Sequence, residues 1–301
     1  MDGQEELARR FERQRGQLRA VAYRMLGSPG EADDAVQEAW LRLSRADVSG
    51  VGDLEAWLRT VVARLCLDAL RSRRARREEP LAEAAVPDGT QGAEPEQEAV
   101  LVDSVGRAML VVLDRLSPAE RVAFVLHDLF AVPFAQIAPI VGRNPAATKK
   151  LASRARQRVR GATAVPGATA VPGATAVRGA ELGRQRQVVD AFLAAARSGD
   201  LRALLAVLAP DVVRRADLIA LQPGGEAVVR GGEAVARQTM VLGPRARFAE
   251  PALVNGAVGA VIAPHGRLVV ALAITVRDDR IVAYDVIADP ERLRKLDLAV
   301  L

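Results

Sequence analysis

Apolar residues recur at intervals of three and four along the first 77 residues, which is the spacing of one face of an α-helix. One predicted helix begins at Ser28-Pro29-Gly30-Glu31, where a Ser, a Pro and a Glu match a capping box. Another runs from Leu54 towards Arg77, where it ends in a cluster of arginines. We therefore expect an all-helical N-terminal domain over residues 1–77.

The same spacing continues over residues 117–160, where three successive helices are predicted. The first begins at the capping box Ser117-Pro118-Ala119-Glu120. Gly142 supplies a turn before the third helix, which begins at Asn144-Pro145. Helices joined by a short turn that contains glycine are typical of a helix-turn-helix, whose last helix enters the major groove of DNA.

The predicted third helix has two different faces on a helical wheel. One face carries Thr148, Leu151, Ala152, Ala155 and Val159. The other carries Lys149, Lys150, Ser153, Arg154 and Gln157. Lysine and arginine contact phosphates, and arginine also pairs with guanine, so the second face fits a DNA groove. A solvated basic face on an ordinary three-helix bundle explains the same pattern, and the pattern alone leaves both interpretations open.

Beyond residue 181 the pattern changes to helices followed by strands. Helices are predicted at 182–197, 201–208 and near 232–242, and strands at 247–254, 258–263, 267–276 and 280–287. Turn signals such as Asn255-Gly256 separate the strands. This order predicts an α+β domain with one curved antiparallel sheet over residues 181–301.

Two segments have the composition of linkers. Residues 78–105 carry eight acidic and no basic residues, with three prolines. Residues 161–180 contain the hexapeptide Gly161–Pro166, which recurs as Gly167–Pro172 and then with Arg178 in place of proline. Such short, uncharged Gly-Pro repeats cannot build a packed unit, so we predict a tether there.

Charge and cysteine content narrow the function classes. The net charge is +5, and residues 106–160 carry ten basic and three acidic residues, so the positive charge is densest on the predicted helix-turn-helix. The single cysteine, Cys66, excludes an intrachain disulfide, and with two histidines it cannot form a zinc finger. We expect no metal and no cofactor. No signal peptide or spanning apolar run is seen, so we expect a soluble, cytoplasmic protein without a membrane partner.

Motifs along the chain resemble a known family. Asp34-Ala-Val-Gln-Glu-Ala-Trp-Leu41, Ala56-Trp-Leu-Arg-Thr-Val-Val62 and Leu67-Asp-Ala-Leu-Arg71 resemble the sigma-2 domain of extracytoplasmic-function (ECF) sigma factors of the sigma-70 family. Leu116-Ser-Pro-Ala-Glu-Arg121, Ile137-Ala-Pro-Ile-Val-Gly-Arg143 and Leu151-Ala-Ser-Arg-Ala-Arg156 resemble their sigma-4 domain. Gly199-Asp200-Leu201, Leu208-Ala-Pro-Asp-Val212 and Asp289-Pro-Glu-Arg-Leu293 resemble a SnoaL-like domain of the NTF2-like cone fold.

The resemblance implies a multidomain protein with two all-α sigma domains and an α+β NTF2-like domain. It implies a sigma factor that binds the clamp helices and flap of core RNA polymerase and directs initiation at promoter DNA. Its fused C-terminal domain would modulate that activity, with room for a small apolar ligand. No catalytic residue is expected.

The resemblance also implies residue roles. Polymerase docking falls to Asp34, Gln37, Glu38 and Leu41. Recognition and melting of the −10 element falls to Trp57, Arg59, Arg64, Arg71, Arg73 and Arg74. Recognition of the −35 element falls to Asn144, Thr148, Lys149, Lys150, Ser153 and Arg154. A regulatory contact of the C-terminal domain is expected at Asp289, Pro290, Glu291, Arg292 and Leu293.

Two alternatives stay open at this point. The chain could be an NTF2-like enzyme (isomerase, cyclase or hydrolase) whose helical half only targets DNA, with Asp211, Asp217, Asp285 and His265 as the available acids and bases. It could also be an ordinary DNA-binding repressor that makes no contact with polymerase. The acidic helix around Asp34 separates these alternatives from a sigma factor, because only a sigma factor needs it for docking.

Overall fold

The computed structural model describes residues 2–46, 50–78, 106–160, 174–221, 224–241 and 246–301. They fall into two compact units. The first comprises residues up to Gly106 together with Leu113–Arg156, and the second comprises Arg107–Val112 with Gln157–Leu301. The predicted linker, apart from Glu78, and residues 161–173 of the predicted tether lie outside the described residues.

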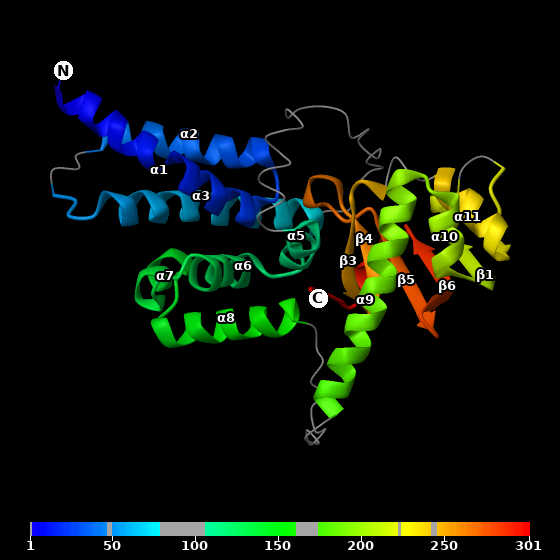
Figure 1. The fold of residues 1–301 in the computed structure, drawn as a ribbon. Coiled ribbons are helices and arrows are strands. Elements are labelled where there is room, and N and C mark those ends of the chain that lie inside the picture. The colour runs from blue at the N-terminus through cyan, green and yellow to red at the C-terminus, as the bar shows by residue number, and fades with distance from the viewer. Residues whose placement is uncertain (1, 47–49, 79–105, 161–173, 222–223, 242–245) are drawn as a thin grey trace. The chain divides into compact units, whose positions relative to one another are not determined.

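Three helices form the N-terminal part of the first unit, namely α1 (Asp2–Leu26), α2 (Pro29–Arg45) and α3 (Leu54–Glu78). They lie side by side and pack on one another (Figure 1). Their shared core is fully buried and includes Tyr23, Met25, Leu43, Leu58 and Leu67. The predicted all-helical domain is present because the apolar stripe of each helix needs partners to cover it.

The cap of α2 differs in part from the prediction. Ser28 is the N-cap, and its hydroxyl accepts a hydrogen bond from Glu31 N at 3.4 Å. The Glu31 carboxylate forms an ion pair with Arg73 of α3 at 3.1 Å. Within the described part of the chain, half of the predicted capping box is therefore formed, because the glutamate is engaged by a neighbouring helix instead.

The second helical group consists of α5 (Arg107–Asp114), α6 (Pro118–Phe124), the π-helical turn η1 (Val125–Leu129), α7 (Phe134–Val141) and α8 (Pro145–Val159). The capping box at α6 is complete: Ser117 N donates to Glu120 at 3.1 Å, and Glu120 N donates to the Ser117 hydroxyl at 3.4 Å. Leu129 ends the π-helical turn and is 37% exposed. The wider π turn shifts the phase of the helix at its end, which carries this residue outwards.

The second unit combines α9 (Ala174–Ser198), α10 (Leu201–Val207), α11 (Gly232–Val241) and α13 (Pro290–Lys295) with a seven-stranded sheet. Two short 3₁₀ turns, η2 (Leu218–Ala220) and η3 (Pro264–Gly266), connect strands. The strand order is β2-β1-β6-β5-β4-β3-β7. The strands are β1 (Leu208–Ala216), β2 (Val228–Arg230), β3 (Ala249–Val254), β4 (Ala257–Ile262), β5 (Val270–Arg277), β6 (Arg280–Ile287) and β7 (Leu298–Ala299).

Helices cover one face of this sheet. Helix α9 runs across β3, β4 and β5, while α10 and α11 pack on β1 (Figure 1). Phe192 of α9 meets Tyr284 of β6 with ring centroids 5.6 Å apart in the shared core. The α+β class predicted from the sequence is confirmed by this arrangement of helices and sheet.

Two features of the second unit correct the predictions. Strand β1 pairs with β6 in parallel, so the sheet is not wholly antiparallel. No strand was predicted at β1 because Pro210 interrupts its pattern at an exposed position in the irregular part of the strand, where a missing backbone donor is tolerated. Helix α9 begins at Ala174, inside the predicted tether, in the repeat copy where Arg178 replaces proline. Without that proline the helix can extend towards the N-terminus.

Candidate nucleic-acid interface

The helix-turn-helix predicted from the sequence is formed by α7 and α8. Gly142 ends α7 in the left-handed region, with φ of 68°, which glycine adopts without strain. Asn144 then begins α8, and its side-chain oxygen accepts a hydrogen bond from Ala147 N at 2.8 Å. Pro139 lies inside α7 and is exposed. Local backbone chemistry thus fixes where the second helix begins.

Helix α8 has the two faces that the helical wheel predicted. Thr148, Leu151, Ala152, Ala155 and Val159 are buried, and Lys149, Lys150, Ser153, Arg154 and Gln157 are exposed. The predicted role of Thr148 in DNA contact is wrong. Its side chain is fully buried and its hydroxyl donates to the carbonyl oxygen of Asn144 at 3.0 Å, so it cannot reach a groove.

Two ion pairs fix α8 against the preceding helices. Arg156 donates to Asp128 of η1 at 2.5 Å, and both side chains are partly buried. Arg154 lies 3.5 Å from the carboxylate of Glu120, which is 5% exposed and belongs to the capping box of α6. The guanidinium of Arg154 itself is 60% exposed. The exposed basic face of α8 is therefore presented by a helix that is held in place.

The basic residues of α3 differ in their surroundings. Arg64 and Arg71 are exposed, and Arg71 lies 3.7 Å from Asp68. Arg59 is mostly buried and pairs with Glu55 at 3.7 Å. Trp57 is half-buried at the start of the helix, and Arg74 is exposed near its end.

Arg73 does not fit its predicted role in DNA contact. Its guanidinium donates to the carbonyl oxygen of Leu26 at 3.1 Å and pairs with Glu31 at 3.1 Å. Both partners come from the N-terminal three-helix group, so this arginine joins α3 to α1 and α2. Because the charge of Arg73 is paired with Glu31 in this way, little of it is available to a DNA phosphate.

A buried arginine lies close to this point and was missed by the sequence reasoning. Arg121 of α6 is 2% exposed and pairs with Asp114 at 3.3 Å. Burial lowers the pKa of Arg121 to about 10, while the Asp114 charge acts in the opposite direction. Burial also raises the pKa of the Cys66 thiol to about 12. Cys66 is fully buried.

The proposed docking residues form one stripe along α2. Asp34, Gln37 and Leu41 are exposed, and Glu38 lies among them with its side chain 45% exposed. Glu38 pairs with Arg42 at 2.9 Å. Their spacing of three and four residues places all four on the same helical face. The stripe combines acidic groups with one exposed apolar side chain, which suits a protein contact.

The segment expected to make a regulatory contact is used inside its own unit. Asp289 caps α13 by accepting hydrogen bonds from Glu291 N and Arg292 N at 3.0 and 2.8 Å. Leu293 is buried, and Arg292 pairs with Asp217. Pro290 and Glu291 are exposed. Asp289, Arg292 and Leu293 therefore stabilise this end of the domain, and a regulatory contact through residues 289–293 stays a prediction.

Two of the candidate acids of the enzyme alternative are paired within the domain. Asp217 accepts hydrogen bonds from Ala288 N at 3.0 Å and from Asp289 N at 2.9 Å, in addition to its pair with Arg292. Asp285 lies 3.5 Å from Arg215, and Asp211 is exposed. His265 is not among the residues whose side chains the structure describes.

Buried polar side chains lie between α11 and the sheet. Tyr284 and Thr239 share a hydrogen bond of 2.8 Å, and burial raises the pKa of Tyr284. Arg214 donates to the side chain of Gln238 at 2.8 Å. These contacts join α11 to β1 and β6, and no sequence motif indicated them.

The second unit includes the first residues of α5. Ala108 N donates to Glu250 at 2.9 Å, and Arg107 lies 3.5 Å from the same carboxylate. The Arg107 guanidinium also lies 5.5 Å from the ring centre of Phe248. A carboxylate at the start of a helix is favourable because the free backbone N–H groups there carry partial positive charge. This contact was missed because its members stand 142 positions apart in the chain.

Comparisons with known proteins agree with these observations. The family model Sigma-70 region 2 matches residues 10–76, and Sigma-70, region 4 matches residues 106–159. ECF RNA polymerase sigma factor SigJ of Mycobacterium tuberculosis is 39% identical over 94% of this chain and 91% of that protein. The chain belongs to the ECF sigma factors. A probable ECF sigma factor, SigI of the same species, is also 39% identical, over 67% of each chain.

A solved structure of an ECF sigma factor is also similar. The crystal structure of SigJ from Mycobacterium tuberculosis covers 95% of this sigma factor and 98% of that chain, at 34% identity and a TM-score of 0.45. Among the described residues, no group of three or more His, Cys, Asp and Glu side chains is placed to hold a metal ion. No helix in the described ranges is long and apolar enough to cross a membrane.

Proposed function

We propose that this ECF sigma factor binds core RNA polymerase and directs initiation at promoters with a −10 and a −35 element. The observation that carries the proposal is the exposed basic face of α8, held by caps and ion pairs on a helix-turn-helix. That face bears Lys149, Lys150 and Arg154 in a chain whose relatives are named as RNA polymerase sigma factors. The proposal assigns polymerase contact to residues 1–77, together with −10 recognition, and −35 recognition to residues 106–160.

The −35 element is read as duplex by α8. Lys149 and Lys150 contact phosphates, and Ser153 and Arg154 face the base edges from the next turn of the helix. Asn144 lies exposed at the helix N-terminus, where the partial positive charge of the helix end favours a phosphate. This set omits Thr148, because that side chain is buried.

The −10 element is recognised and melted by α3. Strand opening needs unstacked bases to be captured while their phosphates are held by cations. Arg64, Arg71 and Arg74 are exposed cations of this helix, and Arg59 and Trp57 lie nearer its start. No bond is made or broken by these residues, because the sigma factor contributes binding energy to opening by the polymerase.

Docking on the polymerase clamp helices falls to the acidic stripe of α2, and region 4 meets the flap. Asp34 and Glu38 supply negative charge for steering, and Leu41 adds an apolar contact that survives salt screening. Because core polymerase works in the cytoplasm, the proposal includes a cytoplasmic location. A small apolar ligand in the C-terminal unit stays a prediction from the family resemblance.

The C-terminal unit modulates activity through the start of α5. Glu250 and Phe248 hold Arg107 and Ala108, which precede the helix-turn-helix in the chain. These contacts restrain the start of region 4, so we propose that the C-terminal unit lowers transcription. The proposal adds Glu250 and Phe248 to residues 289–293 as the regulatory contact.

The test is transcription in vitro with purified core polymerase, the full chain and a template carrying both promoter elements. The proposal requires that the chain co-purify with core polymerase and that a run-off product depend on the chain. A matched protein with Lys149→Gln, Lys150→Gln and Arg154→Gln keeps the docking stripe and should bind core polymerase while losing the product. Failure of the unaltered chain to bind core polymerase, or tight duplex binding without polymerase, would refute it and would favour a repressor.

A further inference from the structure

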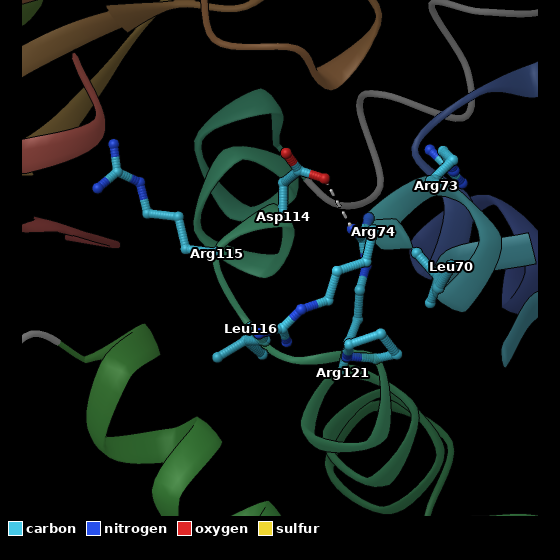
Figure 2. Close-up of a pocket in the computed structure, with 8 residues that line it drawn as sticks. Leu70, Arg73, Arg74, Asp114, Arg115, Leu116 and Arg121 are labelled. Carbon is cyan, nitrogen blue, oxygen red and sulfur yellow. Dashed lines mark hydrogen bonds and ion pairs between the residues drawn. The ribbon is translucent and has the colours of Figure 1, made fainter. Parts of the chain in front are cut away.

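The first unit contains a pocket of about 240 Å³. Its walls include Leu70, Arg73 and Arg74 from the end of α3, Asp114 from α5, and Pro118 and Arg121 from α6 (Figure 2). The pocket therefore lies where the two helical groups of this unit meet.

The lining of the pocket is cationic. Four arginines and one aspartate contribute to it. Figure 2 shows that Arg115 is directed away from the other lining side chains, and Arg73 also pairs with Glu31 outside the lining at 3.1 Å. Asp114 faces Arg121, and its carboxylate accepts one hydrogen bond from that guanidinium at 3.3 Å (Figure 2). Arginines therefore outnumber acidic side chains in the lining by four to one.

Donors inside this charged pocket are buried without acceptors. Among the described residues, Nε of Arg121 and Nε of Arg73 are buried and have no hydrogen-bond partner. The Arg121 side chain is 3% exposed, so bulk water does not solvate it. Leaving such a donor unmatched destabilises the fold, and the penalty is larger for a charged group. The lowered pKa of Arg121 is consistent with a cation that is poorly solvated.

A multivalent anion would satisfy these groups together. Phosphoryl oxygens accept several hydrogen bonds at once, and arginine binds them in a bidentate manner. Duplex DNA does not fit, because a side chain that is 3% exposed is out of reach of a phosphate on a rigid helix. A small soluble ion can enter the pocket. We propose that this pocket binds the phosphoryl group of a small phosphorylated anion, either free phosphate or the terminal phosphates of a nucleotide.

Binding would have a consequence for the two helical groups. The cations come from α3 and α6, so one bound anion would bridge the helices and stabilise their packing. It would also engage Arg74, which we assigned to the −10 element, and so compete with promoter DNA. Only this consequence rests on the proposed function, whereas binding itself can be measured on the chain alone.

The experiment measures binding to the full chain by calorimetry and by thermal unfolding. Sodium phosphate, sodium pyrophosphate and ADP are titrated separately against sodium chloride at equal ionic strength, without polymerase or DNA. The matched variants are Arg74→Gln, at the exposed side of the pocket, and Arg76→Gln, an exposed arginine of the same helix that does not line it. Arg121→Lys is a second pocket variant. Because Arg121 is buried, this change could unfold the protein, and Arg74→Gln then still tests the pocket.

We expect saturable binding that raises the melting temperature, and a loss of at least about tenfold in affinity in Arg74→Gln, which corresponds to 1.4 kcal/mol. The Arg76→Gln protein should bind within about twofold of the unaltered chain. Tightest binding of phosphate would identify a free ion, and tightest binding of ADP a nucleotide. The proposal is overturned if none of the probes binds beyond the chloride control, or if both variants bind equally well. If the chain binds phosphate but does not bind polymerase, the anion site is supported and only the proposed sigma function is refuted.

Discussion

Arg156 of α8 donates a hydrogen bond of 2.5 Å to the carboxylate of Asp128, which lies in the π-helical turn that follows α6. The pair joins the proposed recognition helix to the helix that it packs on, and both side chains are partly buried. Arg156 follows Lys149 by seven residues and lies at the edge of the exposed basic face, so its pair with Asp128 sets the orientation of that face. Orientation of α8 is thus controlled by a residue that a DNA contact map would not include.

Replacing Asp128 by Asn should impair promoter discrimination while the protein stays folded. A partly buried charged hydrogen bond contributes about 0.5–1 kcal/mol, so the melting temperature should fall by about 2–4 °C. Transcription from a template with an altered −35 element should fall less than from the intact one. Glu181→Gln is the matched control, because Glu181 and Arg184 form an exposed pair at the same 2.5 Å distance. If both changes have the same effect on discrimination, the orienting role of Asp128 is wrong.

Removing charge from the exposed face of α8 should weaken promoter binding in a salt-dependent way. Lys150→Gln removes one cation from a side chain that is exposed and not part of the buried face. If it neutralises one phosphate, the slope of log affinity against log salt should decrease by about 0.9. Polymerase holoenzyme and a labelled promoter give this slope from titrations at several salt concentrations. Arg237→Gln removes an equally exposed cation from the C-terminal unit and should leave the slope unchanged.

The faces of α8 could be predicted from the sequence because they depend on local geometry. A periodicity of about 100° per residue fixes which side chains share a face, and the caps at Ser117 and Asn144 involve partners three residues away. Thr148 was nevertheless placed among the DNA contacts through family resemblance, although the wheel had put it on the apolar face. Thr148 is buried, as its position on the helical wheel indicated.

Long-range contacts could not be predicted in this way. The engagement of Arg73 depends on Leu26 and Glu31, more than forty positions earlier in the chain. The burial of Arg121 depends on how α3 meets α6, and a pattern of hydrophobic residues carries no signal for it. Strand β1 was missed because its parallel partner β6 stands far along the chain and Pro210 obscures its pattern.

Charge reversal on α2 should abolish polymerase binding without unfolding the protein. Asp34→Arg changes an exposed side chain at the N-terminal end of the docking stripe, so a complementary basic surface would now be repelled. We expect at least about a tenfold loss of affinity for core polymerase, which is about 1.4 kcal/mol, measured by pull-down and by fluorescence anisotropy. Glu12→Arg makes the same change in charge on α1, where Glu12 is exposed and pairs with Arg15, and should have no such effect. Equal losses in both proteins would indicate a general effect of charge.

The buried thiol of Cys66 should make the fold less stable at alkaline pH. Burial raises its pKa from 9.0 to about 12, so the unfolded chain loses this proton above about pH 9 while the folded chain keeps it. The folded state then binds more protons, and its stability falls as pH rises from about 9 to about 12. Urea unfolding at pH 8 and pH 10.5 should show a drop in the unaltered chain that exceeds the drop in Cys66→Ala by about 1–2 kcal/mol. Equal drops in the two proteins would show that the thiol does not titrate between pH 8 and pH 10.5. Titration of Arg121 cannot cause a difference between the two proteins, because both contain it.

Weakening the hold of the C-terminal unit on α5 should raise transcription. Glu250→Gln keeps an oxygen that can accept from Ala108 N but removes the charge that faces Arg107 and the helix start. A carboxylate at a helix N-terminus contributes about 0.3–1 kcal/mol, so release of region 4 should raise run-off transcription by about two- to fivefold. Glu233→Gln is the control, because that residue pairs with Arg237 on the exposed surface of α11 in the same unit. A fall in transcription in Glu250→Gln alone would mean that the C-terminal unit assists region 4, because the same contact would then be holding α5 in its active position.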